Sequence, residues 1–211
     1  MIHLLRIIPA FAATALLLSM LPGQGMAMLL RQTMSSGREA GLLASIGTGT
    51  GLILWSWLSA LGLSAVFAAS PFAYNALRIV GALYLFFLAA STLYALRKVS
   101  GKFDLEEASP MSRGASYRVG LITNLTNVKA AVFAVAFIPG FVPRDFPVGS
   151  GIAILGVVQA LTSIAWNMSL VIAVDRATRL LARPLVRRWL TLASALGLLL
   201  LATGLLLASR R

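Results

Sequence analysis

Six long apolar segments, separated by short hydrophilic ones, constrain the fold of this chain more than any other feature of its sequence. A helix needs about 20 mostly apolar residues to cross the hydrocarbon core of a bilayer, and six segments reach that length. Apolar residues cover most of the circumference of each segment, as on lipid-facing helices. The sequence therefore predicts an all-α integral membrane protein with six transmembrane helices, near residues 7–30, 41–69, 72–96, 117–142, 148–174 and 189–208.

Composition excludes the main alternatives to a membrane protein. Only 11% of the residues are charged, about half the share found in soluble domains, and the 59% that are hydrophobic argue against disorder. The chain has no cysteine and a single histidine, His3, so disulfides, thiolate metal sites and histidine catalysis are not expected. No residues pair as nucleophile and base or as acid and base. We therefore expect no enzyme, no metal site and no cofactor.

The chain divides into two halves of three predicted helices. We expect a single transmembrane domain over residues 1–211, with one repeat at about 1–97, a cytoplasmic loop at about 98–116 and a second repeat at about 117–211. When residues 71–95 are aligned with 184–208, nine positions are identical. An odd number of helices per repeat inverts the second repeat relative to the first in the membrane.

Basic residues predict the orientation. A net charge of +12 in a soluble protein would point to nucleic acid as a partner. Here the charge lies in the short segments between apolar helices, which is typical of multi-pass membrane proteins, so no nucleic-acid partner is expected. Twelve of the 18 basic residues lie on the side of the 98–116 loop and five on the other; the positive-inside rule then predicts both termini outside the cytoplasm. The stretch from Arg6 to Ala27 also has features of a cleavable secretory signal, which leaves a five-helix alternative open.

Two predicted helices are interrupted. Residues 21–25 read Leu-Pro-Gly-Gln-Gly, where proline removes a backbone donor and glycine permits non-helical backbone. Residues 124–129 read Asn-Leu-Thr-Asn-Val-Lys, a polar cluster inside an apolar run. Paired interruptions in corresponding helices of two repeats indicate a transport site near the middle of the membrane.

Lys129 is the only ionisable residue deep inside a predicted helix. A charge there costs about 2.5–3.5 kcal/mol on insertion scales, so the lysine either faces a cavity or is satisfied by backbone carbonyls and the neighbouring asparagines. Asn124 and Asn127 are three residues apart and are expected on one helix face. They either bind a zwitterionic substrate or form hydrogen bonds between helices.

Two further helices carry polar stripes that should face inward. One contains Thr48, Trp55 and Ser59, and the other contains Gln159, Ser163, Trp166 and Asn167. Both lining a pathway and packing helices fit such stripes. Glu39 and Asp175 lie at cytoplasmic helix ends, where we expect them to pair with the adjacent Arg38 and Arg176.

Glycines at a spacing of four predict close helix packing. Gly37/Gly41 and Gly47/Gly51 have the small-xxx-small spacing that lets helix backbones approach each other. The Gly-Thr-Gly-Thr-Gly run at 47–51 lacks the spacing and the preceding strand of a phosphate-binding loop. Small-residue faces are also compatible with a homodimer.

Three stretches resemble the LysE-type amino-acid exporter family. They are Pro22-Gly23 with the small residues at 41–51, the run at 77–85 (Leu-Arg-Ile-Val-Gly-Ala-Leu-Tyr-Leu), and residues 124–129 continuing to Phe-Ile-Pro-Gly-Phe-Val at 137–142. The order of the helices is similar over essentially the whole chain. The chain differs at Gln24 and Val128, where the family often has proline, and at Leu52 and Asn167, where it often has an acidic residue.

The resemblance implies an exporter of amino acids or closely related small zwitterions in the bacterial cytoplasmic (inner) membrane. Its partners would be the small-molecule substrate and the lipid bilayer, with alternating access between the two repeats and proton coupling left open. The alternatives are a transporter of another small solute or cation on the same scaffold, and a membrane protein that organises partners without transport. The expected substrate-translocation residues are Pro22, Gly23, Gln24, Thr48, Asn124, Asn127, Lys129 and Asn167.

Overall fold

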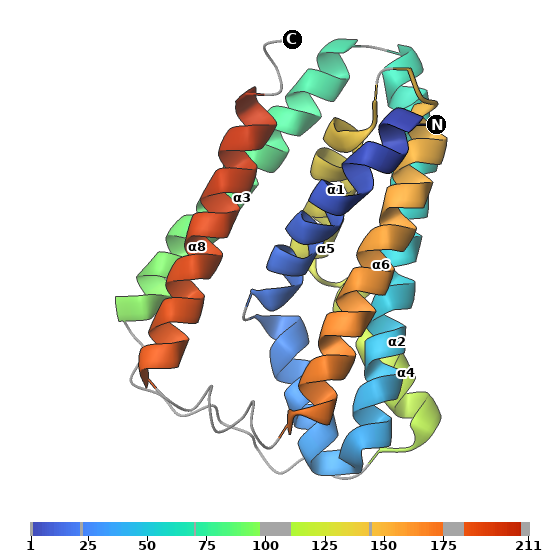
Figure 1. The fold of residues 1–211 in the computed structure, drawn as a ribbon. Helices are drawn as coiled ribbons and strands as arrows, with labels where there is room; N and C mark the ends of the chain where they lie inside the picture. Colours follow the sequence, from blue (N-terminus) through green and yellow to red (C-terminus); the bar gives the residue numbers. More distant parts are fainter. Residues whose placement is uncertain are drawn as a thin grey trace.

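The computed structural model describes residues 2–21, 23–69, 71–97, 111–143, 145–174 and 184–207, and this part of the chain is helical with no β-strand. Its elements are α1 (Ile2–Met20), α2 (Gln24–Ala69), α3 (Pro71–Arg97), α4 (Arg113–Leu125), α5 (Val128–Val132), the π-helix η1 (Phe133–Phe137), the 3-10 helix η2 (Ile138–Phe141), α6 (Val148–Ile172) and α8 (Pro184–Leu207). They form a bundle in which α1 begins and α8 ends at the same end of the molecule (Figure 1). The predicted all-α class is confirmed.

Helix α2 turns back on itself at Gly37. This glycine has φ 85° and ψ 174°, a backbone region that is essentially restricted to glycine. It divides α2 into a short part, 24–36, which continues beyond the end of α1, and a long part, 38–69, which runs back along the bundle (Figure 1). The predicted packing role is therefore wrong for Gly37, which has open space around it, but Gly41 does lie against Thr33 and Val171.

Glycines bring the long part of α2 close to α4 and α6, the helices with which α2 packs most extensively. Gly47 lies against the Tyr117 carbonyl of α4, and Gly51 against the Asn124 side chain. On the other side, Gly49 lies against Ile164 of α6. The close approach predicted for Gly47 and Gly51 is confirmed, and here it joins helices within one chain.

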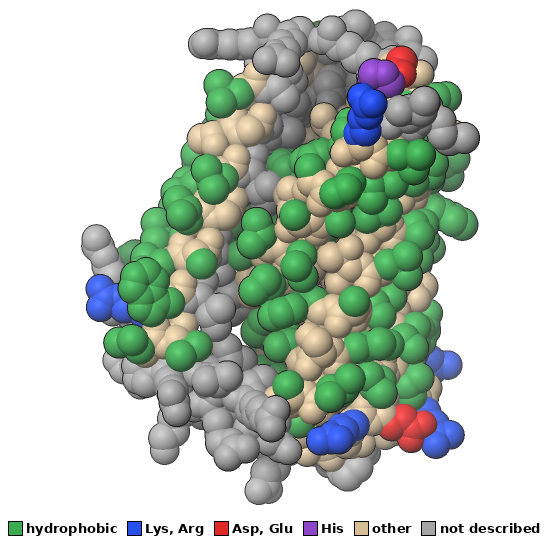
Figure 2. All heavy atoms as spheres, viewed as in Figure 1, with side chains coloured by type: hydrophobic (Ala, Val, Ile, Leu, Met, Phe, Trp, Pro, Cys, Tyr) green, Lys and Arg blue, Asp and Glu red, His purple; other side chains and the backbone are tan. Residues whose placement is uncertain are grey.

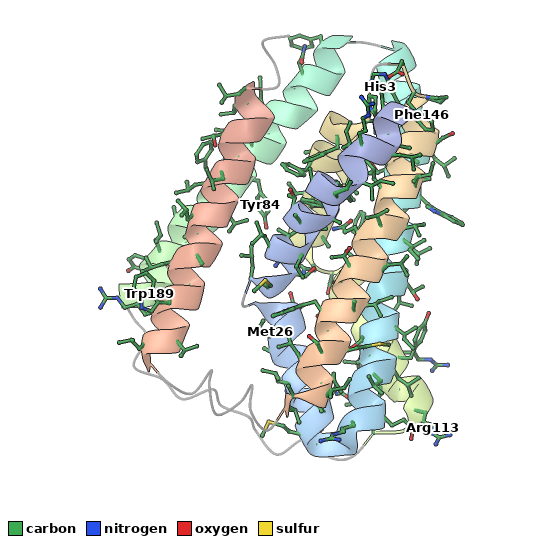
Figure 3. The ribbon with its side chains drawn as sticks, in the orientation of Figure 1. His3, Met26, Tyr84, Arg113, Phe146 and Trp189 are labelled. Carbon is green, nitrogen blue, oxygen red and sulfur yellow. The ribbon has the colours of Figure 1, made fainter. Side chains whose placement is uncertain are left out.

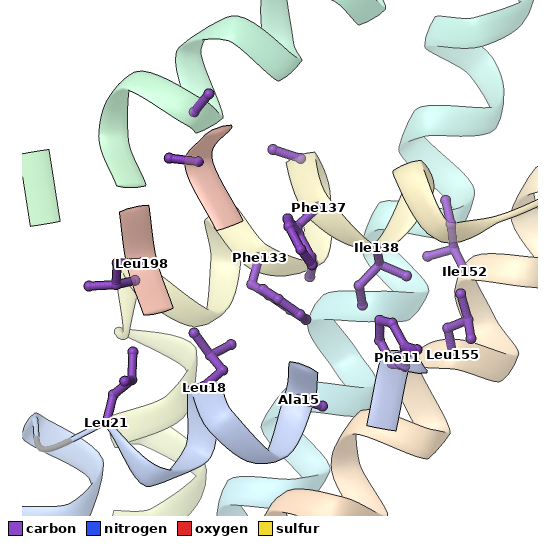
Figure 4. Close-up of a cluster of buried hydrophobic side chains, with 14 of the residues drawn as sticks. Phe11, Ala15, Leu18, Leu21, Phe133, Phe137, Ile138, Ile152, Leu155 and Leu198 are labelled. Atoms are coloured by element: carbon purple, nitrogen blue, oxygen red, sulfur yellow. The ribbon is translucent and has the colours of Figure 1, made fainter. Parts of the chain in front are cut away.

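The main apolar core lies between α1, the η1–η2 segment, α6 and α8 (Figure 4). Its centre is a set of phenylalanine rings. Phe133 stacks on Phe137 with ring centroids 4.7 Å apart, and Phe11 meets Phe141 edge-on at 5.2 Å. Such aromatic pairs add about 0.5–1.5 kcal/mol beyond the area they bury, and they fix the η1–η2 segment against α1.

The surface and the helix lengths fit a membrane protein. Hydrophobic side chains cover most of the middle of the visible face, and most of the charged ones lie toward its two ends (Figure 2). Figure 3 places His3 and Phe146 at one end of the bundle and Arg113 at the other. By length and composition, three helices are long and apolar enough to cross a bilayer: α1 at 3–20, α2 at 24–62, a range that includes the turn at Gly37, and α6 at 148–172. The bent pair Arg113–Leu125 and Val128–Phe141 is a fourth candidate. Shorter apolar stretches lie in α3 and α8, which pack chiefly against each other.

An ion pair at the Arg113 end differs from the predicted one. Glu39 of α2 pairs with Arg113 of α4, with 2.7 Å between Glu39 Oε1 and Arg113 Nε and a second bond of 3.0 Å from the guanidinium to Oε2. The expected pairing with Arg38 is therefore wrong. The start of the long part of α2 and the start of α4 bring residues from two halves of the chain together here. The predicted Asp175–Arg176 pair and residues 98–110 of the predicted 98–116 loop lie outside the described residues.

Candidate functional site

Two helix interruptions lie against each other in the bundle. The first separates α1, which ends at Met20, from α2, which begins at Gln24; the second separates α4, which ends at Leu125, from α5, which begins at Val128. The Lys129 ammonium connects them, because Nζ donates a hydrogen bond to the Leu18 carbonyl at 3.4 Å. A cation is favoured at this position, since the last carbonyls of a helix carry partial negative charge.

The first interruption brings the end of one helix next to the start of another. The Leu21 N–H donates to the Leu18 carbonyl at 3.4 Å, and the Gly23 carbonyl accepts from Ala27 at 3.0 Å as the first bond of α2. One side of the break is therefore a helix C-terminus and the other a helix N-terminus. Pro22, expected to cause the break, lies outside the described residues.

The second interruption is organised by Asn127. Its side-chain Oδ1 accepts a hydrogen bond from the Lys129 N–H at 3.1 Å and so caps α5, while its own N–H donates to the Asn124 carbonyl at 3.0 Å. The two helical segments meet at an angle of 58°. The expectation that Asn124 and Asn127 share one helix face is wrong, because α4 ends at Leu125 and α5 begins only at Val128.

A cavity of about 70 Å³ lies where the interruptions meet. Its walls come from the end of α1, both parts of α2, the α4–α5 break and α6. The lining residues are Leu18, Ser19, Leu21, Gly23, Gly25, Met26, Thr48, Leu52, Asn124, Asn127, Lys129, Ala130, Gln159, Ser163 and Asn167.

Most of the expected site residues line this cavity. Gln24 does not, since its side chain is exposed, and Pro22 lies outside the described residues. The remaining expected residues, found together in the cavity wall, are Gly23, Thr48, Asn124, Asn127, Lys129 and Asn167.

The sequence leaves open whether the polar stripes of α2 and α6 line a pathway or pack helices, and the structure shows both uses. In α2, Thr48 reaches the cavity, whereas Trp55 Nε1 donates to the Asn124 carbonyl at 3.3 Å and Ser59 Oγ to the Ala134 carbonyl at 2.9 Å. In α6, Gln159 and Ser163 join Asn167 in the wall. The sequence predicts the α6 stripe but does not assign these two residues to the site, because a polar stripe has the same spacing whether it packs or lines a cavity.

Two of the lining amides are buried with an unsatisfied acceptor. Asn124 is 5% exposed and Gln159 2% exposed, and neither carboxamide oxygen has a hydrogen-bond partner. A buried polar atom without a partner costs about 1–3 kcal/mol. Lys129 is the only charged residue among the described residues that line the cavity. The site therefore combines one cation with unsatisfied neutral acceptors, a set suited to a small zwitterion rather than to a metal ion.

Comparison with known proteins identifies the family. A family model described as LysE type translocator matches residues 16–209. The chain belongs to the LysE type translocator family. As a member of that family, it is a transporter and not an enzyme.

Named relatives of this translocator include efflux proteins. It is 30% identical to the homoserine/homoserine lactone efflux protein of Salmonella typhimurium over 203 residues, which are 96% of each chain. It is 29% identical to the leucine efflux protein of the same organism over 160 residues, 75% of this chain and 74% of the relative. A Bacillus subtilis protein called uncharacterized membrane protein YrhP is 26% identical over 176 residues, 81% of this chain and 84% of the relative. No solved structure matches the translocator.

Proposed function

We propose that this translocator exports amino acids, or closely related small zwitterions, through the cavity between its two interrupted helices. The observation that carries the proposal is the wall of that cavity, which Lys129 shares with two amides whose oxygens are unsatisfied and with both helix breaks. Efflux relatives similar over most of the chain support a cargo of this chemistry.

The arrangement of the helices supports six membrane crossings in two inverted repeats. In this scheme α1 with the short part of α2 is the first crossing and the α4–η2 segment the fourth, each broken near its middle. The long part of α2 and α6 are corresponding helices and pack together, as do α3 and α8 (Figure 1). Contacts between corresponding helices are what a pseudo-twofold axis between inverted repeats produces.

The orientation follows from charge. We place the end that holds Gly37 and Arg113 in the cytoplasm of a bacterial cell and both chain termini outside, because the sequence assigns twelve of the 18 basic residues to the same side as Arg113. The substrate would then reach the cavity from the Arg113 end and leave toward the end of His3. One repeat rocking against the other would expose the cavity to each side in turn.

The two ends of a zwitterion find different partners in the cavity. Its carboxylate would lie near Lys129 and the first backbone N–H groups of the short part of α2, where a helix N-terminus favours negative charge. Its ammonium group needs hydrogen-bond acceptors, which Asn124 and the serine hydroxyls of the wall supply. Four further residues remain proposed members of the pathway because they lie around the two breaks: Pro22, Gln24, Asn127 and Asn167.

The proposal is tested by timing amino-acid release from cells that lack their own exporters and are loaded with dipeptides. Wild type, Lys129→Ala and Arg118→Ala are compared at matched abundance in the membrane. Arg118→Ala is the control, because this substitution removes one positive charge from an exposed position on α4 that does not line the cavity.

Faster release by wild type and by Arg118→Ala, but not by Lys129→Ala, is the expected result. Release that survives Lys129→Ala would leave the exporter function standing and remove Lys129 from the pathway. If wild type releases no amino acid faster than cells without the protein, the proposed function is wrong.

A further inference from the structure

Two buried side-chain amides from different helices face the same small cavity. Asn124 comes from the end of α4 and Gln159 from the middle of α6, and both are more than nine-tenths buried. Each carboxamide oxygen lacks a hydrogen-bond partner. Two such acceptors beside one cavity are costly inside a membrane, where bulk water is not available to satisfy them.

The missing donors fit an ammonium group. An ammonium has three donors and no acceptor, whereas a carboxamide oxygen accepts two hydrogen bonds. Asn124 Oδ1 lies against Gly51. A half-turn of the terminal amide exchanges its oxygen and nitrogen and breaks no hydrogen bond of that oxygen, since it has none. The hydroxyl of Ser163, on the same wall as Gln159, supplies a third acceptor.

The charge of the cavity wall determines which further charged groups a ligand can have. None of the described residues that line the cavity is acidic, and Lys129 is the one cation among them. The carboxylate of an amino acid can neutralise Lys129, and its α-ammonium can bind to neutral oxygens. A second cationic group, as in lysine or arginine, would lie near Lys129 in a low-dielectric cavity with no anion left to pair with it.

We propose that Asn124 and Gln159 hold the substrate's ammonium group, and that their neutral oxygens make this site selective for amino acids with uncharged side chains over lysine and arginine. Gln159 is then a specificity-determining residue. This inference rests on the proposed export of amino acids and adds to it the class of amino acid.

The test uses purified protein in liposomes and measures counterflow of radiolabelled leucine, homoserine and lysine. Three variants are compared with wild type. Gln159→Met keeps the length of the side chain and removes the acceptor, and Gln159→Glu places a carboxylate at the same position. Ser169→Ala is the control, because that serine lies on the same helix but is exposed and outside the cavity wall.

Wild type should move leucine or homoserine at least tenfold faster than lysine. Gln159→Met should lower neutral amino-acid counterflow about tenfold, and Gln159→Glu should raise the ratio of lysine to leucine transport at least tenfold, while Ser169→Ala changes neither. A shift in this ratio separates recognition from structural damage, because a merely destabilised protein loses both activities together.

The possible failures are distinguishable. Wild type that moves lysine as fast as leucine, or a Gln159→Glu variant with an unchanged ratio, overturns this inference and leaves amino-acid export intact. Full activity of Gln159→Met likewise removes Gln159 from recognition. If wild type moves none of the three amino acids, the proposed function itself fails.

Discussion

Replacing Gly51 by alanine tests how the site is held in shape. A β-carbon at this position would lie 2.7 Å from Asn124 Oδ1, 2.8 Å from Asn124 Cβ and 3.0 Å from Asn124 Cγ. The Cβ of Asn124 is fixed to the backbone of α4, so rotation of the side chain cannot relieve the contact. Either α4 moves away from α2 or the asparagine is displaced, and both change the cavity wall.

The size of the effect follows from the kind of contact. Overpacking a tight interior with one methyl group costs about 1–3 kcal/mol of folding stability. Loss of one hydrogen bond from a displaced Asn124 to the substrate would cost about 0.5–1.5 kcal/mol, and about 1.4 kcal/mol corresponds to a tenfold loss of affinity. Gly49→Ala is the matched control, because its new β-carbon would meet the flexible end of Ile164, which can move aside.

Thermal unfolding in detergent and leucine counterflow give the two measurements. Gly51→Ala should be less stable than Gly49→Ala and should transport several-fold to tenfold more slowly. A double-mutant cycle assigns the cause, because Asn124→Gly removes all three atoms that the new methyl group meets. If Gly51→Ala costs as much stability in the Asn124→Gly background as in wild type, the contact with Asn124 is not the reason and the argument is refuted.

Three further predictions concern the ends and breaks of the helices, each measured by thermal unfolding of purified protein. Gly37→Ala should cost about 1–3 kcal/mol because its backbone is in a region closed to alanine, whereas Gly62→Ala, in open space inside α2, should be neutral or stabilising; equal effects would contradict the turn at Gly37. Asn127→Ala should cost about 1 kcal/mol by removing the cap of α5, and Asn127→Ser should restore most of it; no loss in the alanine variant would exclude the cap. Glu39→Gln should lower the free energy of unfolding by less than about 1 kcal/mol, because the Glu39 and Arg113 side chains are 60% and 78% exposed. A larger loss would contradict the view that this exposed ion pair contributes little to stability.

The helical architecture could be predicted because the residues that form and interrupt each helix are neighbours in the sequence. Long apolar runs set the helices, and the proline, glycine and asparagine residues at 21–25 and 124–129 mark both breaks. Gly37 shows the limit of spacing arguments. Its distance of four residues from Gly41 fits a packing motif, yet Gly37 is the turn between the two parts of α2, and only the backbone angle distinguishes the two roles.

The composition of the cavity depends on which helices meet, and this is not a local property. Gln159 and Trp55 both lie on polar stripes, but one lines the cavity and the other donates to a carbonyl of α4. The sequence predicts that Glu39 pairs with its neighbour Arg38, but Glu39 pairs with Arg113, 74 residues away. In each case the partner is decided by the packing of α2 against α4 and α6, which no spacing along a single helix specifies.

On the proposed function, the same contacts link substrate binding to movement of the repeats. The Leu18 carbonyl accepts from both Lys129 Nζ and the Leu21 N–H at 3.4 Å, so the lysine holds the end of α1 to the α4–α5 break through a long, shared hydrogen bond. A charge-assisted bond to a carboxylate is about twice as strong as one between neutral groups, and no carboxylate lies among the described residues of the wall. The substrate's own carboxylate is therefore the anion best able to draw Lys129 away from Leu18, and its arrival would release the two broken helices from each other.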